Sequence, residues 1–253
     1  MGEALRVEGL SKRFGGVQAL SEVSFCVQTG ERLAIIGPNG AGKTTLFNLI
    51  SGQLPVTAGR IYFFGREITN LAVYRRAHLG LARSFQITSL FLNLSVLENT
   101  LLTLYGTRPS RYQMLRSIYA DRQILAKARE VIEETLLWEK RDWPVKNISY
   151  GEQRRLEIGL TLAAGPKLLL LDEPSNGLTS AESAGIVKMI NQLGKKMTVL
   201  IVAHDMDLVF GVAERIIVLH YGQIISIGRP EEIQADPRVK EIYMGIGEGA
   251  ESA

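Results

Sequence analysis

A nine-residue loop, Gly37 to Thr45, most constrains how this chain can fold. It reads GPNGAGKTT and lies between the apolar runs 33–36 and 46–50. Its glycines allow positive backbone φ angles, so successive amide N–H groups can converge on an anion. The flanking runs predict a buried strand before the loop and a helix after it, and that helix directs the positive end of its dipole at the same anion. The loop therefore predicts a phosphate-binding site in an α/β protein.

The loop also fits the pattern G-x-x-x-x-G-K-[ST] at every fixed position. In that pattern the lysine, here Lys43, reaches the β and γ phosphates of a nucleotide. The hydroxyl of Thr44 is a suitable ligand for Mg²⁺. We therefore expect a nucleoside triphosphate and Mg²⁺ at this loop.

Two acidic residues farther along the chain supply groups that the loop lacks. Four consecutive leucines, 168–171, predict a strand buried on both faces of a parallel sheet, and Asp172 and Glu173 follow it directly. Asp172 can hold its carboxylate near the Mg²⁺ on Thr44, and Glu173 can orient or deprotonate an attacking water. Without the loop, an acidic turn exposed to solvent would explain the same two residues.

Gln86 and His204 each end a predicted core strand. Open α/β sheets bind ligands at the carboxyl ends of their strands, so both side chains are candidates for the same site. The amide of Gln86 could contact the metal and the water, and the imidazole of His204 could bond the γ phosphate. A purely structural role for these two polar residues is the alternative.

The order of the predicted elements indicates an α/β fold, in which strands and helices alternate. Residues 5–36 alternate with period two and predict an antiparallel β layer at the start of the chain. Residues 95–146 have helical spacing, with a capping box at Ser95 and Glu98, and predict an inserted helical subdomain. Further strands are expected at 61–64, 81–85, 168–171 and 198–203, and helices at 121–137 and 152–164.

Two local signals near the end of the chain add detail. Thr179 and Glu182 form a second capping box and predict a helix after it. Tyr221 and Gly222 lie between two apolar runs and predict the turn of a β-hairpin, which a short helical tail follows.

Composition and charge narrow the classes of protein. The chain has 253 residues, of which 46% are hydrophobic and 22% charged, as in folded globular proteins. The net charge is +3 with Lys and Arg interspersed among acids, which favours a mixed solvated surface over one that binds nucleic acid. The single cysteine, Cys26, excludes an intramolecular disulfide.

The sequence offers no signal for export or membrane insertion. Its opening residues, MGEALRVEGL, match neither a secretion signal nor a myristoylation motif. No apolar run approaches the roughly 18 to 20 residues that cross a bilayer. We therefore expect a soluble cytoplasmic protein.

Taken in order, these segments resemble the nucleotide-binding subunit of an ATP-binding cassette (ABC) transporter over residues 5–245. The landmarks that carry the resemblance are the aromatic Phe14, the Walker A loop Gly37 to Thr45, the Q-loop residue Gln86, the signature ISYGEQ at 148–153, the Walker B segment 168–173 and the switch residue His204. The resemblance implies ATP hydrolysis on a P-loop NTPase core with a mixed or parallel sheet.

The resemblance also implies a set of site residues. Glu173 would be the catalytic base, with His204 and Gln86 beside it. Mg²⁺ would be held by Thr44, Gln86 and Asp172. ATP would contact Phe14, Asn39, Gly40, Ala41, Gly42, Lys43, Thr44, Thr45, Ser149, Gly151 and Glu152.

The signature segment distinguishes this family from other P-loop proteins. In the family, a Ser and a Gly at a helix N-terminus bind the γ phosphate of ATP held by the opposite subunit, so two cassettes sandwich two nucleotides. Ser149 and Gly151 are retained here. Tyr150, Glu152 and Thr179 depart from the common residues, which are Gly, Gln and Asp. These departures concern the contacts across the dimer that the resemblance implies, and we expect ATP binding to be retained.

Within the family, the chain resembles the importers of branched-chain amino acids. The likeness rests on the residues around Gln86, the run 94–99, the stretch after the signature and the ending at 227–245. It implies a second cassette as partner in a homo- or heterodimer, two transmembrane permease subunits and an extracytoplasmic substrate-binding protein. The implied location is peripheral, on the cytoplasmic face of the inner membrane. Residues 87–93, Phe91 among them, would be the docking surface for a membrane subunit.

Three alternatives remain. Importers for urea or short amides are similar in sequence, so the cargo is open. A soluble ABC ATPase that acts on DNA or ribosomes is a second reading, but the block between Gln86 and Ile148 is too short for a coiled-coil arm and the chain has one Walker A loop. A P-loop kinase or GTPase is a third, and the sequence has no N-K-x-D tetrapeptide to read guanine.

We predict that the whole chain, 1–253, is a single ABC ATPase domain. Residues 1–86 and 166–245 would form the nucleotide-binding core with its β layer. Residues 87–165 would form the helical subdomain with the signature, and 246–253 a flexible tail.

Overall fold

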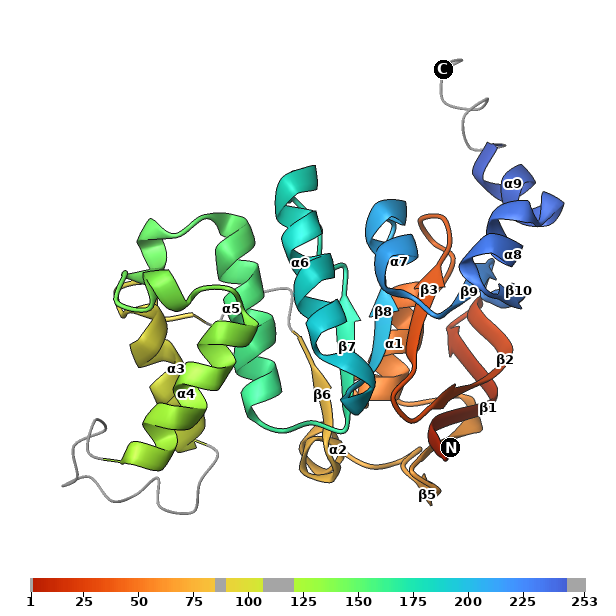
Figure 1. The fold of residues 1–253 in the computed structure, drawn as a ribbon. Helices are drawn as coiled ribbons and strands as arrows, with labels where there is room; N and C mark the ends of the chain where they lie inside the picture. Colours follow the sequence, from red (N-terminus) through yellow and green to blue (C-terminus); the bar gives the residue numbers. More distant parts are fainter. Residues whose placement is uncertain (1, 85–89, 107–120, 245–253) are drawn as a thin grey trace. The chain divides into compact units, whose positions relative to one another are not determined.

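The computed structural model describes residues 2–84, 90–106 and 121–244 of the chain (Figure 1). The chain divides into two compact units. The first unit consists of Met1–Ala82, Lys167–Glu173 and Lys195–Ala253, and the second of Arg83–Pro166 and Pro174–Gly194. The second unit thus includes residues 174–194, which the sequence analysis assigned to the core; the predicted subdomain boundaries stay a prediction. The predicted tail, 246–253, lies outside the described residues.

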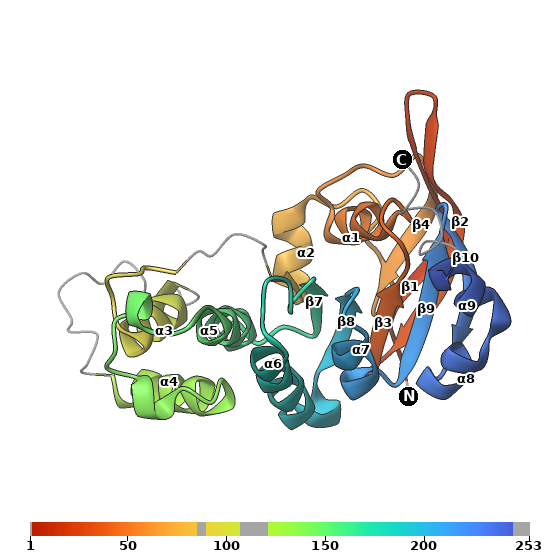
Figure 2. The same ribbon diagram turned by 90° about the horizontal axis from the view of Figure 1, so that it is seen from above.

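An antiparallel sheet opens the first unit, as predicted. Its strand order is β2-β1-β4-β5, and Figure 2 labels β2, β1 and β4 of this sheet. Its strands are β1 (Glu3–Phe14), β2 (Val17–Gln28), β4 (Ala58–Phe63) and β5 (Arg66–Glu67). The apolar residues of β1 and β2 alternate with exposed ones, so one face of this sheet packs on the core. β4 ends one residue earlier than predicted because Phe64 has a φ of 46° and turns the chain into β5.

The second sheet of the first unit has six strands in the order β10-β9-β3-β8-β7-β6. They are β3 (Arg32–Ile36), β6 (Leu81–Arg83), β7 (Leu168–Asp172), β8 (Thr198–Val202), β9 (Arg215–His220) and β10 (Gln223–Gly228). β3 lies between β8 and β9 and is parallel to both, and β7 is parallel to β8. Every residue of β7 and β8 is buried, as expected for central parallel strands.

The sheet order corrects one prediction. The period-two pattern of residues 5–36 suggested a single antiparallel layer, but β3 belongs to the parallel sheet. The last four residues of β3 are all buried, so this strand is apolar on both faces. It therefore lacks the alternation of buried and exposed side chains that β2 shows. The predicted mixed sheet of the α/β class is confirmed.

The described part of the first unit contains five α-helices, and α1 packs in its hydrophobic core. They are α1 (Lys43–Ser51), α2 (Val73–Leu79), α7 (Met206–Val212), α8 (Pro230–Ala235) and α9 (Pro237–Met244). Leu46, Phe47 and Ile50 of α1 pack against Leu168 and Leu170 of β7 in this core. The 3-10 helix η5 (Gly194–Lys196) precedes β8.

A buried arginine joins α1 to α2. The side chain of Arg76 is 2% exposed, and its guanidinium donates to the carbonyl oxygens of Leu49 and Ile50 at 2.7 Å each, at the end of α1. It also donates to the carbonyl oxygens of Thr69 and Leu71 at 2.8 Å each. Burial lowers the pKa of this guanidinium to about 10. Arg76 therefore satisfies carbonyls that a helix end leaves without partners.

The second unit is helical. It contains α3 (Val96–Gly106), α4 (Arg122–Glu134), α5 (Tyr150–Ala163), α6 (Ser180–Gln192) and the 3-10 helices η3 (Trp138–Lys140) and η4 (Val145–Asn147). The predicted capping box at Ser95 and Glu98 is present at the start of α3, with bonds of 2.7 and 3.1 Å. Asp121 caps α4, and the apolar face of α4 packs against α3 and α5.

The predicted hairpin near the end of the chain is confirmed. β9 and β10 pair antiparallel around Tyr221 and Gly222, whose φ angles are 45° and 75°. Two successive positive φ angles define the turn type whose twist matches that of paired strands.

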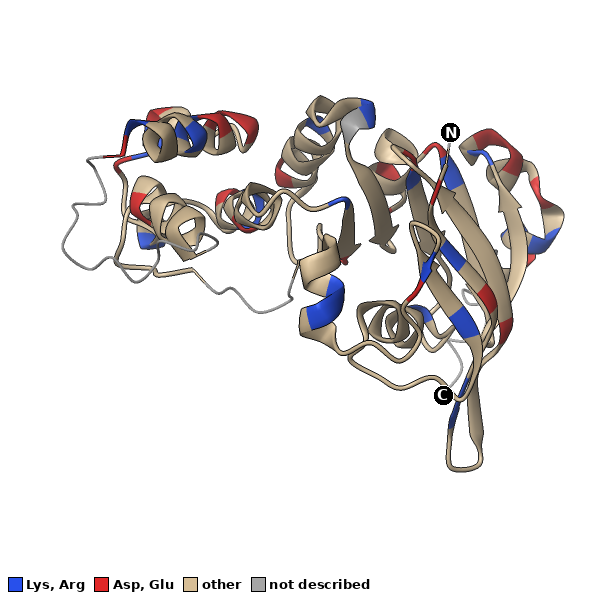
Figure 3. Cartoon of the chain, turned by 90° about the horizontal axis from the view of Figure 1, so that it is seen from below, with Lys and Arg blue, Asp and Glu red and all other residues tan. Residues whose placement is uncertain are grey.

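Figure 3 marks the charged residues on the described elements as seen from one side. Basic and acidic residues are interspersed both on the strands of the first unit and on the helices of the second (Figure 3). Within the described part of the chain, no helix has the length and hydropathy needed to cross a bilayer.

Candidate functional site

The loop between β3 and α1 has the backbone geometry that the sequence predicts. Gly37, Gly40 and Gly42 have φ angles of 153°, 80° and 102°, which side chains disfavour. A Cβ on Gly37 would lie 2.1 Å from the carbonyl oxygen of Leu219, and one on Gly42 would lie 2.8 Å from that of Ala19. A Cβ on Gly40 would meet nothing within 4 Å. The loop is therefore packed on two sides and open at Gly40.

The start of α1 is free to bind an anion. Gly42 precedes the helix and has no side chain to cap it, and no acidic residue lies in the first turn. The helix dipole and the amide N–H groups of the first turn therefore favour a negative ligand at this end.

Lys43 lies folded against the loop that precedes it. Its ammonium donates to the carbonyl oxygens of Gly37 at 2.6 Å and Pro38 at 2.9 Å, and the side chain is 7% exposed. Burial lowers the pKa of Lys43, while the charges of Glu173 and Asp172 oppose that shift. A buried cation with negative neighbours is suited to bind a phosphate.

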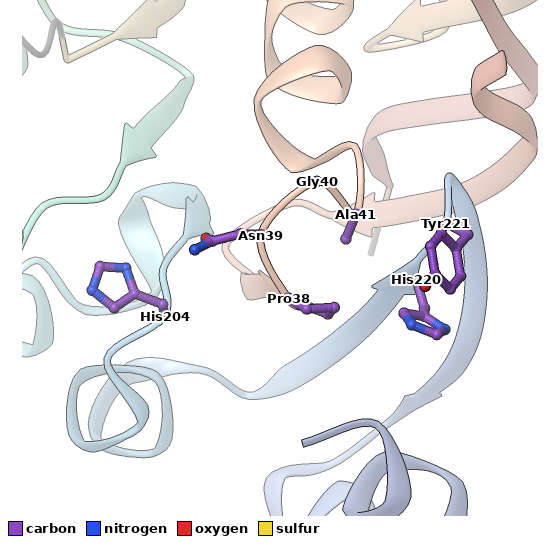
Figure 4. A pocket seen from close by; sticks show the side chains of 8 residues that line it. Pro38, Asn39, Gly40, Ala41, His204, His220 and Tyr221 are labelled. Atoms are coloured by element: carbon purple, nitrogen blue, oxygen red, sulfur yellow. The ribbon is translucent and has the colours of Figure 1, made fainter. Parts of the chain in front are cut away.

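A pocket of about 600 Å³ opens beside this loop. It is lined by Gly37, Pro38, Asn39, Gly40, Ala41, His204, His220 and Tyr221 (Figure 4). Its volume lies within the range of small-molecule sites. Three of the predicted nucleotide contacts, Asn39, Gly40 and Ala41, thus share one cavity with His204.

The predicted metal ligands include two oxygen donors of the first unit. Asp172 ends β7 and is 1% exposed, and Thr44 is exposed in the first turn of α1. Within the described residues, no group of three or more His, Cys, Asp and Glu side chains could bind a metal by itself. A carboxylate, a hydroxyl and substrate phosphates are the donors that Mg²⁺ takes in nucleotide sites, so these residues fit that ion.

Glu173 and His204 contact each other at the ends of adjacent strands. Glu173 Oε2 lies 2.5 Å from His204 Nδ1. His204 Nδ1 donates to this carboxylate when the imidazole carries its proton on that nitrogen. The parallel register of β7 and β8 brings the two residues together, and the Glu173 amide donates to the carbonyl oxygen of Val202 at 2.8 Å.

The backbone of Glu173 is strained. Its φ is 47°, a left-handed conformation that costs free energy in residues other than glycine. The side chain is 17% exposed and that of His204 is 62% exposed. The geometry therefore fixes a carboxylate and an imidazole, in contact, at the carboxyl edge of the sheet.

The signature segment begins a helix in the second unit. Ser149 is the N-cap of α5 and forms a capping box with Glu152, so α5 starts two residues before the predicted helix. Burial alone would raise the pKa of Glu152, but hydrogen bonds from Lys140 and the Ser149 amide outweigh it and leave the pKa lowered. Glu152 thus caps the helix and pairs with Lys140 at 2.7 Å.

The carboxylate of Glu182 accepts hydrogen bonds from two groups of the signature segment, a contact that the sequence analysis did not predict. Its Oε1 accepts from the hydroxyl of Ser149 at 2.9 Å and from the amide of Gly151 at 3.1 Å. A Cβ on Gly151 would lie 2.7 Å from the Glu182 side chain, so glycine is needed at that position. The available signal was the capping box of Thr179 and Glu182, which the structure confirms at the start of α6.

These hydrogen bonds predict a pH-dependent contribution of Glu182 to stability. Bonds from the Thr179 amide, the Ser149 and Thr179 hydroxyls and the Gly151 amide lower its pKa from 4.5 to about 2. The unfolded chain therefore takes up this proton first, so the contribution is present above about pH 4.5 and is lost as the pH falls toward 2. We expect E182Q to reduce the loss of stability on acidification, measured by urea unfolding between about pH 3 and pH 6.

Glu130→Gln is the matched control for that experiment. Glu130 lies on α4 of the same unit and forms an exposed ion pair with Lys127. Exposed ion pairs contribute about 0 to 1 kcal/mol, so its removal should leave the pH profile as in the parent. Equal acid sensitivity of E182Q and the parent would contradict the assignment.

The remaining predicted residues lie as follows. Phe14 ends β1 with 45% exposure and lies under the ammonium of Lys12 at 4.9 Å. Thr45 is half-buried in α1. Gln86 falls outside the described residues, as does the 87–89 part of the docking surface, and Phe91 is 60% exposed. His220 and Tyr221, which line the pocket, were interpreted from the sequence only as part of a hairpin.

The fold and the loop define a P-loop nucleotide-binding protein. A glycine loop follows the central parallel strand β3 and leads into helix α1. The buried Asp172 ends β7, which is separated from β3 in the sheet by β8.

Comparisons with known proteins identify the family. The ABC transporter family model matches residues 20–176, and that of the branched-chain amino acid ATP-binding cassette transporter matches 223–248. The high-affinity branched-chain amino acid transport ATP-binding protein LivG of Salmonella typhimurium is 36% identical over 248 residues, which are 95% of this chain and 97% of that protein. The chain belongs to the ABC transporter family.

Solved structures agree with this assignment. The ADP conformation of MJ1267, an ATP-binding cassette of an ABC transporter, superposes with a TM-score of 0.85 at 34% identity and covers 97% of this chain and 100% of that one. The ATP-binding cassette MJ0796, a dimer in a post-hydrolysis state bound to ADP and Pi, gives a TM-score of 0.71 at 26% identity, with coverage of 89% and 98%.

Proposed function

We propose that this chain is the ATP-hydrolysing subunit of an ABC importer for branched-chain or related amino acids. The observation that carries the proposal is the contact of Glu173 with His204 at the carboxyl edge of a sheet whose neighbouring strand enters the phosphate loop. The similarity to LivG and the match of residues 223–248 support the cargo class.

The first unit binds ATP and carries out its hydrolysis. The loop amides and Lys43 hold the phosphates, which requires the ammonium to exchange the carbonyls of Gly37 and Pro38 for phosphate oxygens. Thr44 and Asp172, with Gln86, would hold Mg²⁺. Bound there, it would supply positive charge to neutralise the β and γ phosphates.

Glu173 accepts the proton of the attacking water. The carboxylate is held by its backbone and by His204, so it loses little freedom when it orients a water. His204 then supports the γ phosphate through the part of its ring that does not contact Glu173. Glu173 directly follows β7 and His204 lies two residues after the end of β8, so both side chains are close to the ends of rigid strands.

The second unit acts on the nucleotide of a partner cassette. Ser149 and Gly151 present a hydroxyl and an amide at the N-terminus of α5, where the helix dipole favours an anion. The Glu182 carboxylate lies on these donors here, so they accommodate an acidic oxygen at hydrogen-bonding distance. The dimeric state of MJ0796 supports a second cassette as partner.

The further partners are two membrane permease subunits and an extracytoplasmic substrate-binding protein. In this assembly the chain lies at the cytoplasmic face of the membrane. ATP closes the cassette dimer, hydrolysis reopens it, and the motion passes to the membrane subunits.

The test is a pull-down of the tagged chain from mildly solubilised native membranes, with ATPase activity and leucine uptake assayed on the reconstituted complex. We expect two membrane subunits, a second cassette and ATP-dependent uptake of leucine in preference to urea. Uptake of urea instead would overturn the cargo class. Ribosomal or DNA-repair proteins without a membrane subunit would overturn transport and leave the ATPase assignment.

A further inference from the structure

A single carboxylate joins the N-terminal turns of two helices in the second unit. Glu182 lies in the first turn of α6, and its Oε2 accepts from the Thr179 amide at 3.1 Å and the Thr179 hydroxyl at 3.0 Å. Its Oε1 accepts from α5 instead, from the Ser149 hydroxyl at 2.9 Å and the Gly151 amide at 3.1 Å. The capping box of α6 therefore uses only one of the two oxygens.

Glu182 is not needed to cap α5, because that helix has a complete capping box of its own. The Ser149 amide donates to the Glu152 carboxylate at 2.9 Å, and the Glu152 amide donates to the Ser149 hydroxyl oxygen at 3.3 Å. Glu182 thus adds a second carboxylate at the same helix end, on the two donors that the capping box leaves. The bonds that it accepts lower its pKa to about 2, so it is an anion at neutral pH.

Close packing of α6 on α5 holds this carboxylate in place. A Cβ on Gly151 of α5 would lie 2.7 Å from the Glu182 side chain. A Cβ on Gly185 of α6 would lie 2.6 Å from a guanidinium nitrogen of Arg155 of α5. Ser149 is nevertheless exposed, so an anion on another molecule can approach its hydroxyl from solvent.

A second anion at these donors has to displace Glu182. The Ser149 hydroxyl and the Gly151 amide each carry one proton, and both protons are donated to Glu182 Oε1. A phosphate oxygen that takes the same two protons would contact the carboxylate, and like charges at contact distance repel. Occupation by Glu182 and occupation by a phosphate therefore exclude each other.

We propose that Glu182 is an autoinhibitory group that occupies the signature donors of the free chain and leaves them when a partner cassette presents the γ phosphate of its ATP. This inference rests on the proposed role of Ser149 and Gly151 in binding the partner's nucleotide. Closure of the dimer then breaks two hydrogen bonds to Glu182 at the signature of this chain. The competition raises the concentration of ATP that association requires.

The experiment measures ATP-dependent association in the E173Q background, in which the proposed base is removed and hydrolysis does not deplete the closed state. E173Q and E173Q/E182Q are sedimented with ATP and Mg²⁺, alone and mixed with the cassette that co-purifies with the chain. Glutamine serves in a capping box as glutamate does, so E182Q preserves the start of α6. It lacks the charge that strengthens the hydrogen bonds from α5, and we expect it to lower the dissociation constant of the dimer about tenfold.

Two further variants in the same background are the controls. E130Q removes a carboxylate of the same unit, which forms an exposed ion pair with Lys127, and it should leave the dissociation constant within about twofold. S149A removes one of the two donors and should weaken association. A purely structural role of Glu182 predicts the opposite sign for E182Q, because a looser link between α5 and α6 would weaken association as well.

Association of E173Q/E182Q that is equal to or weaker than that of E173Q, with S149A impaired, would overturn the inference and leave the proposed function intact. Failure of the proposed function gives a different pattern. S149A would then associate as E173Q does, or no sample would associate in response to ATP.

Discussion

Replacing Glu173 with glutamine should lower the rate of ATP hydrolysis by about 10²- to 10⁴-fold while ATP still binds. The range is the usual contribution of a general base, and the change removes only the ability to accept a proton. Glutamine has the same length as glutamate, and its amide oxygen can still accept a hydrogen bond from His204 Nδ1. The neutral amide can therefore replace the carboxylate in the 2.5 Å contact with His204. The backbone strain at φ 47° is nearly the same for both residues.

The measurement is steady-state phosphate release together with the Kd for ATP. Because binding is retained and turnover is not, E173Q should also accumulate a closed dimer in the presence of ATP, seen by size-exclusion chromatography. H204A should reduce turnover as well, since it removes the group that holds the Glu173 carboxylate.

The matched control is Glu214→Gln. Glu214 is another acid of the first unit and forms an exposed ion pair with Arg32 at 3.3 Å. Loss of such a pair changes stability by about 0 to 1 kcal/mol and should leave turnover as in the parent. Hydrolysis by E173Q at the parent rate would remove Glu173 from the role of base.

Local patterns were sufficient to predict the elements that form the phosphate site. The glycines and Lys43 lie in a loop whose conformation their own chemistry dictates, and the leucines of β7 are too apolar to lie anywhere but in a central strand. The capping boxes of α3 and α6 likewise depend on residues three apart. In each case the interactions that fix the structure are close in sequence.

Contacts between segments far apart in sequence could not be predicted in this way. The pairing of β3 with β8 and β9 depends on strands about 165 to 185 residues later, so a period-two pattern alone could not separate it from the antiparallel layer. The bonds of Glu182 to Ser149 and Gly151 depend on α6 packing beside α5. The pocket wall at Tyr221 depends on the hairpin lying against the loop.

Arg76 is another residue whose role only the tertiary structure reveals, and its replacement should cause the largest loss of stability. Its four hydrogen bonds all go to backbone carbonyl oxygens, two at the end of α1 and two in the segment before α2. Gly52 leaves room for the guanidinium, since a Cβ there would lie 2.7 Å from Arg76 Nε. In this fold, α1 carries the phosphate loop at its other end.

We expect R76A to destabilise the protein by about 3 to 5 kcal/mol. A buried carbonyl that loses its hydrogen-bond partner costs about 1 to 3 kcal/mol, and part of the loss is recovered because the charged group is no longer buried. For a chain of this size each kcal/mol shifts the midpoint of thermal unfolding by about 2 to 4 °C, so a decrease of about 10 °C should be measured by calorimetry. R76K should fall between, because a lysine has three donors on one atom and cannot reach both groups of carbonyls at once.

Arg75→Ala is the control that separates this effect from a general effect on α2. Arg75 is the preceding residue of the same helix, is exposed, and lies 5.8 Å from the ring of Tyr74. Its replacement should shift the midpoint by less than about 2 °C, since surface substitutions usually change stability by no more than about 0.5 kcal/mol. An equal midpoint of thermal unfolding for R76A and R75A would contradict the prediction. It would mean that water hydrogen-bonds to the four carbonyl oxygens in place of the guanidinium, so that the end of α1 does not depend on Arg76.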